Sequence, residues 1–155
     1  MGHTKFIHTF LEDSADRSTD KKAFFAVGNW HTYGELNTLA NRLAHLFLEQ
    51  GLQKGDRVAL FIENSAEYIV SYYAVLKAGG ITVALNTENI ADDVAYIARD
   101  CDVRFLIASH RLAARTLMSA PADPFLSSPT SGTGLKAIFV WNGPKEGAPS
   151  ILGVD

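Results

Sequence analysis

The sequence predicts an α/β fold in which helices lie on both faces of a mostly parallel sheet. Short apolar runs of strand length alternate along the chain with segments of helical periodicity. The run Arg57–Ile62 is almost continuously apolar, as expected for a strand buried on both faces of a parallel sheet. Strands and helices in this order are joined by right-handed crossovers, which keeps the strands parallel.

Length and composition fit an ordinary globular chain. The 155 residues suit one domain, with 47% hydrophobic and 20% charged residues. A formal net charge of −3 lacks the basic field that non-specific nucleic-acid binding needs, so no nucleic-acid partner is expected. No apolar run is long enough to span a membrane.

The first part of the chain predicts a helix followed by a hairpin. Apolar residues recur at helical spacing from Phe6 to Leu11, and this helix is expected to end near Ser18–Asp20. Two short strands, Ala23–Val27 and Trp30–Tyr33, then flank the turn pair Gly28-Asn29. An antiparallel hairpin is the simplest arrangement of these strands.

The clearest helix follows Thr32. With Glu35 three residues later, Thr32 forms the pattern of a capping box, and Gly51 supplies a helix terminator. The helix is expected to bury one apolar face, made of Leu36, Leu39, Ala40, Leu43, Leu46, Phe47 and Gln50. Its outward-facing residues are expected to include Asn37, Arg42 and Glu49.

The rest of the chain continues the alternation. Asn64 is expected to cap a helix that stops at Gly79-Gly80. The later elements, in chain order, are a strand Ile81–Leu85, a helix Ala91–Arg99, a strand Val103–Ala108, a helix Arg111–Ser119 and a strand Ala137–Trp141. Residues 121–136 are rich in Pro, Ser, Thr and Gly and predict a flexible loop, and Ile151–Asp155 predicts an irregular tail.

Two polar segments are the candidates for a ligand site. Glu63–Ser65 and Asn86–Asn89 follow predicted strands, and ligands of parallel sheets bind outside the carboxyl ends of strands at a switch in strand order. Both segments also precede helices, where backbone N–H groups can receive an anion. Helix capping is the favoured interpretation, because Asn and Ser are the commonest caps.

Other reactive side chains give weaker signals. The histidines are scattered and no two are spaced i,i+4 on one helix, which gives a metal site little support; they are His3, His8, His31, His45 and His110. The single cysteine, Cys101, fits a reducing compartment and a cytoplasmic location, and an inert, at least partly buried thiol is the favoured interpretation. The cluster Thr130–Lys136 lacks the strand and helix that flank a phosphate loop, so it is interpreted as a linker.

Acidic pairs and tyrosines are also interpreted as structural. Glu12-Asp13 and Asp92-Asp93 are adjacent residues that do not face each other on a helix, and Asp92-Asp93 suits the first turn of one. The tyrosines Tyr68, Tyr72 and Tyr73 are expected to serve core and rim packing.

Several segments together resemble the adenylate-forming (acyl-CoA synthetase, AMP-binding) superfamily. They occur in family order and at family-like spacing over about Lys5–Trp141, and they are Thr32–Leu36, Asn41–Ala44, Gly51-Leu52, Lys54–Leu60, Asn64–Glu67, Leu76–Gly80, Val83–Asn86, Asp93–Ile97 and Phe105–Ile107. Ala84 departs from the pattern, since many members carry Pro there.

The resemblance implies the front portion of a longer enzyme with the acyl-CoA synthetase-like fold. Members adenylate a carboxylic acid with ATP, release pyrophosphate and pass the acyl group to coenzyme A or a carrier thiol. Their phosphate loop, adenine and Mg²⁺ segment, ribose-binding Asp and catalytic Lys come later and are not found in this sequence. We therefore assign no catalytic, cofactor-binding or metal-binding residue here, and residues 1–155 are expected to be an inactive N-terminal fragment of an adenylation domain.

ATP, Mg²⁺ and coenzyme A are thus implied for the full-length parent and none for this fragment. The expected partners are the rest of the parent chain, the parent's carboxylic acid substrate and a second copy bound through the exposed face of the truncated sheet. Two alternatives stay open. One is a free-standing, non-catalytic α/β binding or interaction module, and the other is a small nucleotide-binding α/β domain.

Overall fold

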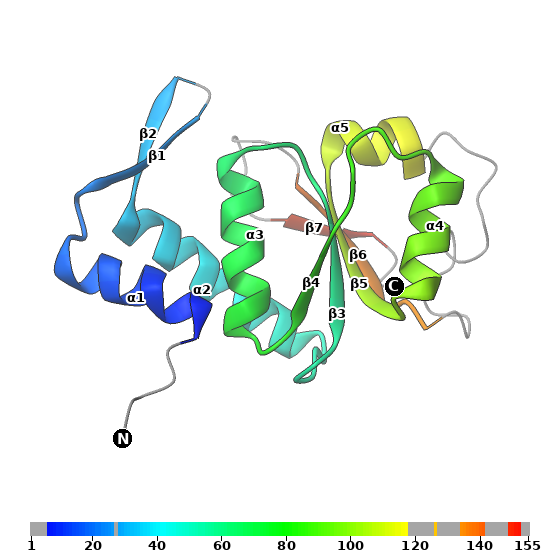
Figure 1. Ribbon diagram of the computed structural model, residues 1–155, viewed down its shortest axis with the longest axis horizontal. Helices are drawn as coiled ribbons and strands as arrows, with labels where there is room; N and C mark the ends of the chain where they lie inside the picture. The colour runs from blue at the N-terminus through cyan, green and yellow to red at the C-terminus, as the bar shows by residue number, and fades with distance from the viewer. Residues whose placement is uncertain (1–5, 27, 118–125, 127–133, 142–148, 153–155) are drawn as a thin grey trace. The chain divides into compact units, whose positions relative to one another are not determined.

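The computed structural model describes residues 6–26, 28–117, 126, 134–141 and 149–152 (Figure 1). The chain folds as two compact units, although its length suits a single domain. The first unit contains residues 1–54 and 64–80, and the second contains residues 55–63 and 81–155. The chain therefore leaves the first unit after residue 54 to contribute a strand to the second, returns at residue 64, and leaves again after residue 80.

In its described residues, the first unit consists of three helices and a hairpin. Its elements are α1 (Ile7–Arg17), β1 (Lys22–Ala26), β2 (Asn29–Thr32), α2 (Tyr33–Glu49) and α3 (Ala66–Lys77). The hairpin expected around Gly28-Asn29 is confirmed, because β1 and β2 pair antiparallel and Gly28 has a φ of +78°. α2 packs against both α1 and α3.

The predicted capping box starts α2. The Glu35 N–H donates to Thr32 Oγ1 at 3.2 Å, and the Thr32 N–H donates to Glu35 Oε2 at 2.9 Å. The buried face of α2 agrees with the predicted one at four positions and adds a second alanine; its residues are Leu36, Ala40, Leu43, Ala44 and Phe47. Gly51 follows the helix with a φ of +81°, as a left-handed terminator requires.

One outward-facing assignment on α2 is wrong. Arg42 and Glu49 are exposed as predicted, but Asn37 is only partly exposed. Its Oδ1 is buried and has no hydrogen-bond partner among the residues that the structure describes. A helical wheel places Asn37 beside the apolar face, and packing within the unit covers that margin.

The cap of α3 is also shifted by one residue. Ser65, and not Asn64, is the N-cap: its backbone is extended and its Oγ accepts the Tyr68 N–H at 3.2 Å. Asn64 is exposed. Both residue types cap helices well, so the position at which the chain turns helical decides between them.

The second unit is built on a five-stranded sheet of order β4-β3-β5-β6-β7. Its elements are β3 (Arg57–Phe61), β4 (Ile81–Ala84), α4 (Ala91–Asp100), β5 (Val103–Ser109), α5 (His110–Leu112), the π-helical turn η1 (Ala113–Leu117), β6 (Ala137–Trp141) and β7 (Pro149–Leu152). The first four strands of that order are parallel, which confirms the predicted α/β class, and β7 is antiparallel to β6.

Two C-terminal expectations need correction. Pro149–Leu152 forms strand β7, where an irregular tail was predicted from Ile151 onward, because the edge of β6 supplies a partner that sequence patterns do not reveal. The helix predicted from Arg111 is a single α-turn that passes into a π-helical turn. Among the described strands, β4 pairs only with β3 and therefore forms an edge of the sheet. The predicted self-association through the sheet stays a prediction.

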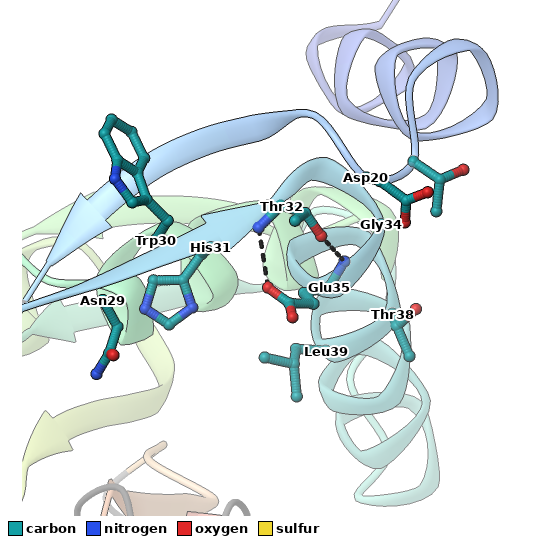
Figure 2. A pocket seen from close by; sticks show the side chains of 10 residues that line it. Asp20, Asn29, Trp30, His31, Thr32, Gly34, Glu35, Thr38 and Leu39 are labelled. Atoms are coloured by element: carbon teal, nitrogen blue, oxygen red, sulfur yellow. Dashed lines mark hydrogen bonds between the residues drawn. The ribbon is translucent and has the colours of Figure 1, made fainter.

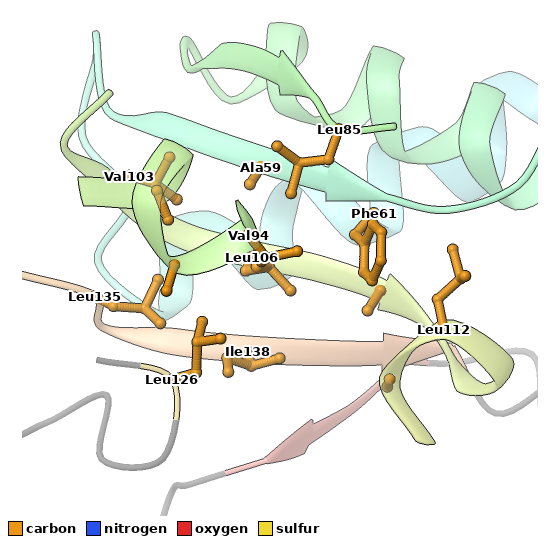
Figure 3. Packing of buried hydrophobic residues seen from close by; sticks show 14 of the residues in the cluster. Ala59, Phe61, Leu85, Val94, Val103, Leu106, Leu112, Leu126, Leu135 and Ile138 are labelled. Carbon is orange, nitrogen blue, oxygen red and sulfur yellow. The ribbon is translucent and has the colours of Figure 1, made fainter. Parts of the chain in front are cut away.

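The core of the second unit lies between the sheet and α4 (Figure 3). Alternate residues of three neighbouring strands face it, and α4 contributes Val94, Ala95 and Ala98; the strand residues are Ala59, Phe61, Leu106, Ala108, Ile138 and Val140. The intervening residues are buried as well; they include Val58, Leu60, Phe105, Ile107 and Phe139. These strands are therefore buried on both faces, as their continuous apolar runs predict.

The flexible loop predicted at 121–136 falls mainly outside the described residues, and its flexibility stays a prediction. Two described leucines in it, Leu126 and Leu135, are buried in the core of the second unit. None of the helices in the described part of the chain is long and apolar enough to cross a membrane.

We expect Gly34→Ala to destabilise the first unit by about 1–3 kcal/mol, the usual range for overpacking. A Cβ at this position would lie 2.5 Å from Thr19 Cγ2 and 3.1 Å from the Thr19 carbonyl oxygen. Thr19 cannot rotate freely, because its Oγ1 donates to the Ala15 carbonyl at 2.7 Å. Urea denaturation measures the change. The double variant Thr19→Ser, Gly34→Ala should recover part of the loss, and no recovery would contradict the steric explanation.

The capping assignment of α3 predicts unequal effects of two neighbouring substitutions. Ser65→Ala should lower the free energy of unfolding by about 0.5–2 kcal/mol, because the Tyr68 N–H loses its acceptor. Asn64→Ala should change it by less than about 0.5 kcal/mol, as for an ordinary surface position. Thermal and urea denaturation of both variants tests this, and a larger loss at Asn64 would restore the cap predicted from sequence.

Candidate functional site

The strand order places the switch point of the sheet between β3 and β5. The chain runs from β3 to β4 on one side and then crosses to β5 on the other side of β3. Ligands of open α/β sheets bind outside the carboxyl ends of the strands at such a point. Glu63, the first residue of the predicted candidate Glu63–Ser65, follows β3 within the second unit and lies at this position.

Glu63 is held there by residues that follow β5. Its Oε1 accepts a hydrogen bond from Arg111 Nε at 2.6 Å, and its carboxylate also accepts from the Ser109 hydroxyl. Burial alone would raise the pKa of Glu63, but the hydrogen bonds from Ser109, from its own backbone N–H and from Arg111, with the Arg111 charge, hold that pKa below its usual value. Glu63 is therefore an ionised, fixed acceptor.

A second arginine ties the neighbouring segment to the same edge. Arg115 donates from its guanidinium to the Thr87 carbonyl, and its Nε lies 3.4 Å from Thr116 Oγ1. Asn86 Oδ1 accepts the Glu88 N–H at 3.0 Å, which makes the segment a local turn. The second predicted candidate, Asn86–Asn89, is thus brought to Arg115 in the segment after β5.

Helix capping accounts for only part of these two segments. Ser65 caps α3, but the N-cap of α4 is Ile90, whose N–H donates to Asp93 Oδ2 at 3.2 Å. The first-turn role expected for Asp92-Asp93 is confirmed. Asn86–Asn89 serves the turn ahead of that helix, since the Asn89 N–H donates to the Asn86 carbonyl at 3.0 Å.

The edge suits recognition of polar groups better than nucleophilic chemistry. The Arg111 side chain is 63% exposed, so it can offer further N–H donors. The Ser109 hydroxyl is committed to Glu63, and its oxygen accepts the Leu112 N–H at 3.2 Å. Within the described part of the chain, no group of three or more His, Cys, Asp or Glu side chains is placed to hold a metal ion.

Sequence reasoning missed Ser109, Arg111 and Arg115. A usable signal existed, because Ser109 and Arg111 directly follow the predicted strand Val103–Ala108, and carboxyl ends of parallel strands meet at one edge. The pairing of Glu63 with Arg111 spans 48 positions of sequence and needs the strand order to be known.

The other sequence candidates have structural roles. Cys101 is partly buried, and its carbonyl accepts from Arg57 Nε at 2.8 Å. Tyr72 and Tyr73 meet edge to face with ring centroids 5.8 Å apart, and burial, followed by the neighbouring tyrosines, raises the pKa of Tyr73. The cluster Thr130–Lys136 lies mostly outside the described residues.

The sequence model of the family described as AMP-binding enzyme matches residues 11–139. The chain belongs to the AMP-binding enzyme family. A long-chain-fatty-acid–CoA ligase of Bacillus subtilis is 40% identical over 103 residues, which are 66% of this chain and 18% of the relative. Surfactin synthase subunit 2 of Bacillus subtilis is 39% identical over 101 residues, 65% of this chain and 3% of the relative.

A CoA ligase of known structure has the same fold. The anthranilate CoA ligase AuaEII, crystallised with anthranoyl-AMP, superposes with a TM-score of 0.79 at 26% identity, over 97% of this chain and 27% of that one. The chain spans between 2% and 22% of the length of the curated relatives considered. It corresponds to the N-terminal part of acyl-CoA ligases of this family.

The Glu63 carboxylate predicts a pH-dependent contribution to stability. Because its folded pKa lies below the unfolded value, the contribution is complete above the unfolded pKa and is lost as pH falls through the folded pKa. Glu63→Gln should cost about 0.5–1 kcal/mol at pH 7, as for a partly exposed pair, and progressively less as pH falls through the folded pKa. Urea denaturation across that range tests it, with exposed Glu49→Gln as the control. A loss independent of pH would contradict the ion-pair assignment.

Proposed function

We propose that this chain is the front portion of an AMP-forming carboxylate ligase. The whole enzyme would join a carboxylic acid to AMP with release of pyrophosphate, and then pass the acyl group to a thiol of coenzyme A or of a carrier protein. The observation that carries the proposal is the match of the AMP-binding family over residues 11–139, which runs through both compact units. Membership of the family makes adenylation the favoured chemistry.

The names of the relatives support a proposal for the substrate class. Three of the eight are named as fatty-acid–CoA ligases, and the other five as a tripeptide synthetase or as synthases of mycosubtilin, surfactin and gramicidin S. We propose a fatty acid and coenzyme A as the reactants of the whole enzyme, because the fatty-acid ligases share larger fractions of their own length with this chain. The reducing environment that suits the lone Cys101 supports a cytoplasmic location.

We propose no binding site for ATP, Mg²⁺ or coenzyme A among the described residues. They contain no metal-binding cluster of side chains, and Thr130–Lys136, the sequence's nearest approach to a phosphate loop, lies mostly outside the described residues. We therefore derive no step of the reaction on this chain. Its own contribution is a buried parallel sheet whose carboxyl edge carries Glu63, Arg111 and Arg115 in fixed positions.

The proposal predicts that activity depends on the length of the chain. The purified 155-residue chain should release no pyrophosphate with ATP, Mg²⁺ and any carboxylic acid, whereas a chain extended to the length of the fatty-acid ligases should do so with a fatty acid. A coupled pyrophosphate assay with a panel of fatty, aromatic and amino acids measures both. Turnover by the 155-residue chain would overturn the assignment of inactivity, and an inactive extended chain would favour the non-catalytic module.

A further inference from the structure

A groove runs along the hairpin strand β2 in the first unit (Figure 2). One wall is the strand itself, and the other is the start of α2 together with the turn that precedes β1. The lining residues are Thr19, Asp20, Asn29, Trp30, His31, Thr32, Gly34, Glu35, Thr38 and Leu39. All four residues of β2 line the groove, although their side chains point alternately to the two faces of the hairpin. The groove therefore follows the edge of the strand and not one of its faces.

That edge of β2 has backbone groups available for pairing. Among the described strands, β2 pairs only with β1. Ala26 and Asn29 close a two-residue turn, so alternation along an antiparallel pair turns the N–H and C=O of Trp30 away from β1. The Thr32 N–H, two residues on, lies on the same edge and donates to Glu35. The Tyr33 N–H points the other way and donates to the Lys21 carbonyl at 3.1 Å.

The charges of the groove restrict what can lie in it. Its lining contains two carboxylates, Asp20 and Glu35, and neither Lys nor Arg. The Trp30 ring is already engaged, with Lys22 Nζ 5.2 Å from its centroid and the Phe25 ring tilted against it at 5.2 Å. A ligand would therefore meet the Trp30 backbone and the carboxylates, which favours an extended chain with basic side chains.

We propose that the β2 groove binds an extended, lysine- or arginine-containing peptide segment of a partner protein, which adds to the hairpin as a third strand. Strand addition in a groove between an edge strand and a helix uses main-chain hydrogen bonds for affinity and side-chain contacts for selection. The four residues of β2 span about 13 Å, and of these Trp30 turns both its N–H and its C=O to the edge that a partner strand would pair with. The Thr32 N–H already donates to the Glu35 carboxylate, so pairing with a partner strand ends at Thr32. The proposal does not depend on ligase activity.

A synthetic peptide tests it directly. We would titrate the ¹⁵N-labelled 155-residue chain with acetyl-Val-Lys-Val-Lys-Val-amide and follow amide chemical shifts. The expected result is saturable shifts centred on Asn29–Thr32 and Asp20, weakened by salt. The matched peptide with Glu in place of Lys should bind at least about tenfold more weakly, because it meets two carboxylates.

Two pairs of variants separate backbone pairing from charge. Trp30→Pro removes the outward N–H without removing a β1–β2 hydrogen bond and should abolish binding, whereas Trp30→Val keeps the N–H and should stay within about threefold of the parent. Asp20→Asn should weaken binding by about three- to tenfold, and exposed Asp16→Asn, outside the groove, should leave it unchanged. If Trp30→Pro does not fold, a lysine peptide N-methylated along its backbone should fail to bind the parent chain.

Several results would overturn the proposal. Equal binding of the Lys and Glu peptides, undiminished binding of the N-methylated peptide, or shifts that avoid β2 would each do so. Self-association of the chain that Trp30→Pro abolishes, and that the lysine peptide does not affect, would assign the edge to a second copy and also overturn it.

Discussion

The pairing of β3 with β5 is the interaction on which the second unit depends. β3 is the first strand of the sheet in sequence and pairs on both edges, so the switch point exists only when β5 joins it. An arginine and a carboxylate fix this pair at each end. Arg57, at the start of β3, donates to the Cys101 carbonyl and pairs with Asp102, which has a φ of +50°. At the other end, Glu63 after β3 binds Arg111 after β5. The arginine belongs to β3 at the start of the two strands and follows β5 at their carboxyl ends.

Sequence patterns predicted what is local and missed what depends on distant partners. The Thr32–Glu35 capping box and the left-handed Gly51 need only their immediate neighbours, and both are present as expected. The strands were recognised because burial on both faces makes them continuously apolar. β7 and the Glu63–Arg111 pair were missed, since each needs a partner that only the folded sheet supplies. Asn64 and Ser65 show the intermediate case, in which chemistry allows two caps and geometry selects one.

The segments that carry the family resemblance serve mainly to build the fold. Thr32 and Glu35 start α2, Gly34 allows its backbone to approach Thr19, and Asn86 forms the turn before α4. The arginine that fixes Glu63 lies outside those segments. The resemblance therefore identified the family and the architecture, while the candidate site emerged only from the arrangement of the carboxyl ends of the strands. This division explains why the two polar segments of the site were predictable and the arginines that bind them were not.

The interleaved order of the two units has a consequence for synthesis on the ribosome. All of the first unit has been made once Gly80 has emerged. The sequence of β3 lies between its two segments, but β3 belongs to the second unit. β3 contains four consecutive buried residues, Val58–Phe61. Both strands that pair with β3 are complete only when Ser109, the last residue of β5, has been made. At typical elongation rates that delay is roughly 2–10 s, during which an apolar strand is without its sheet. A nascent chain of this kind is a natural client for a chaperone that shields extended apolar segments.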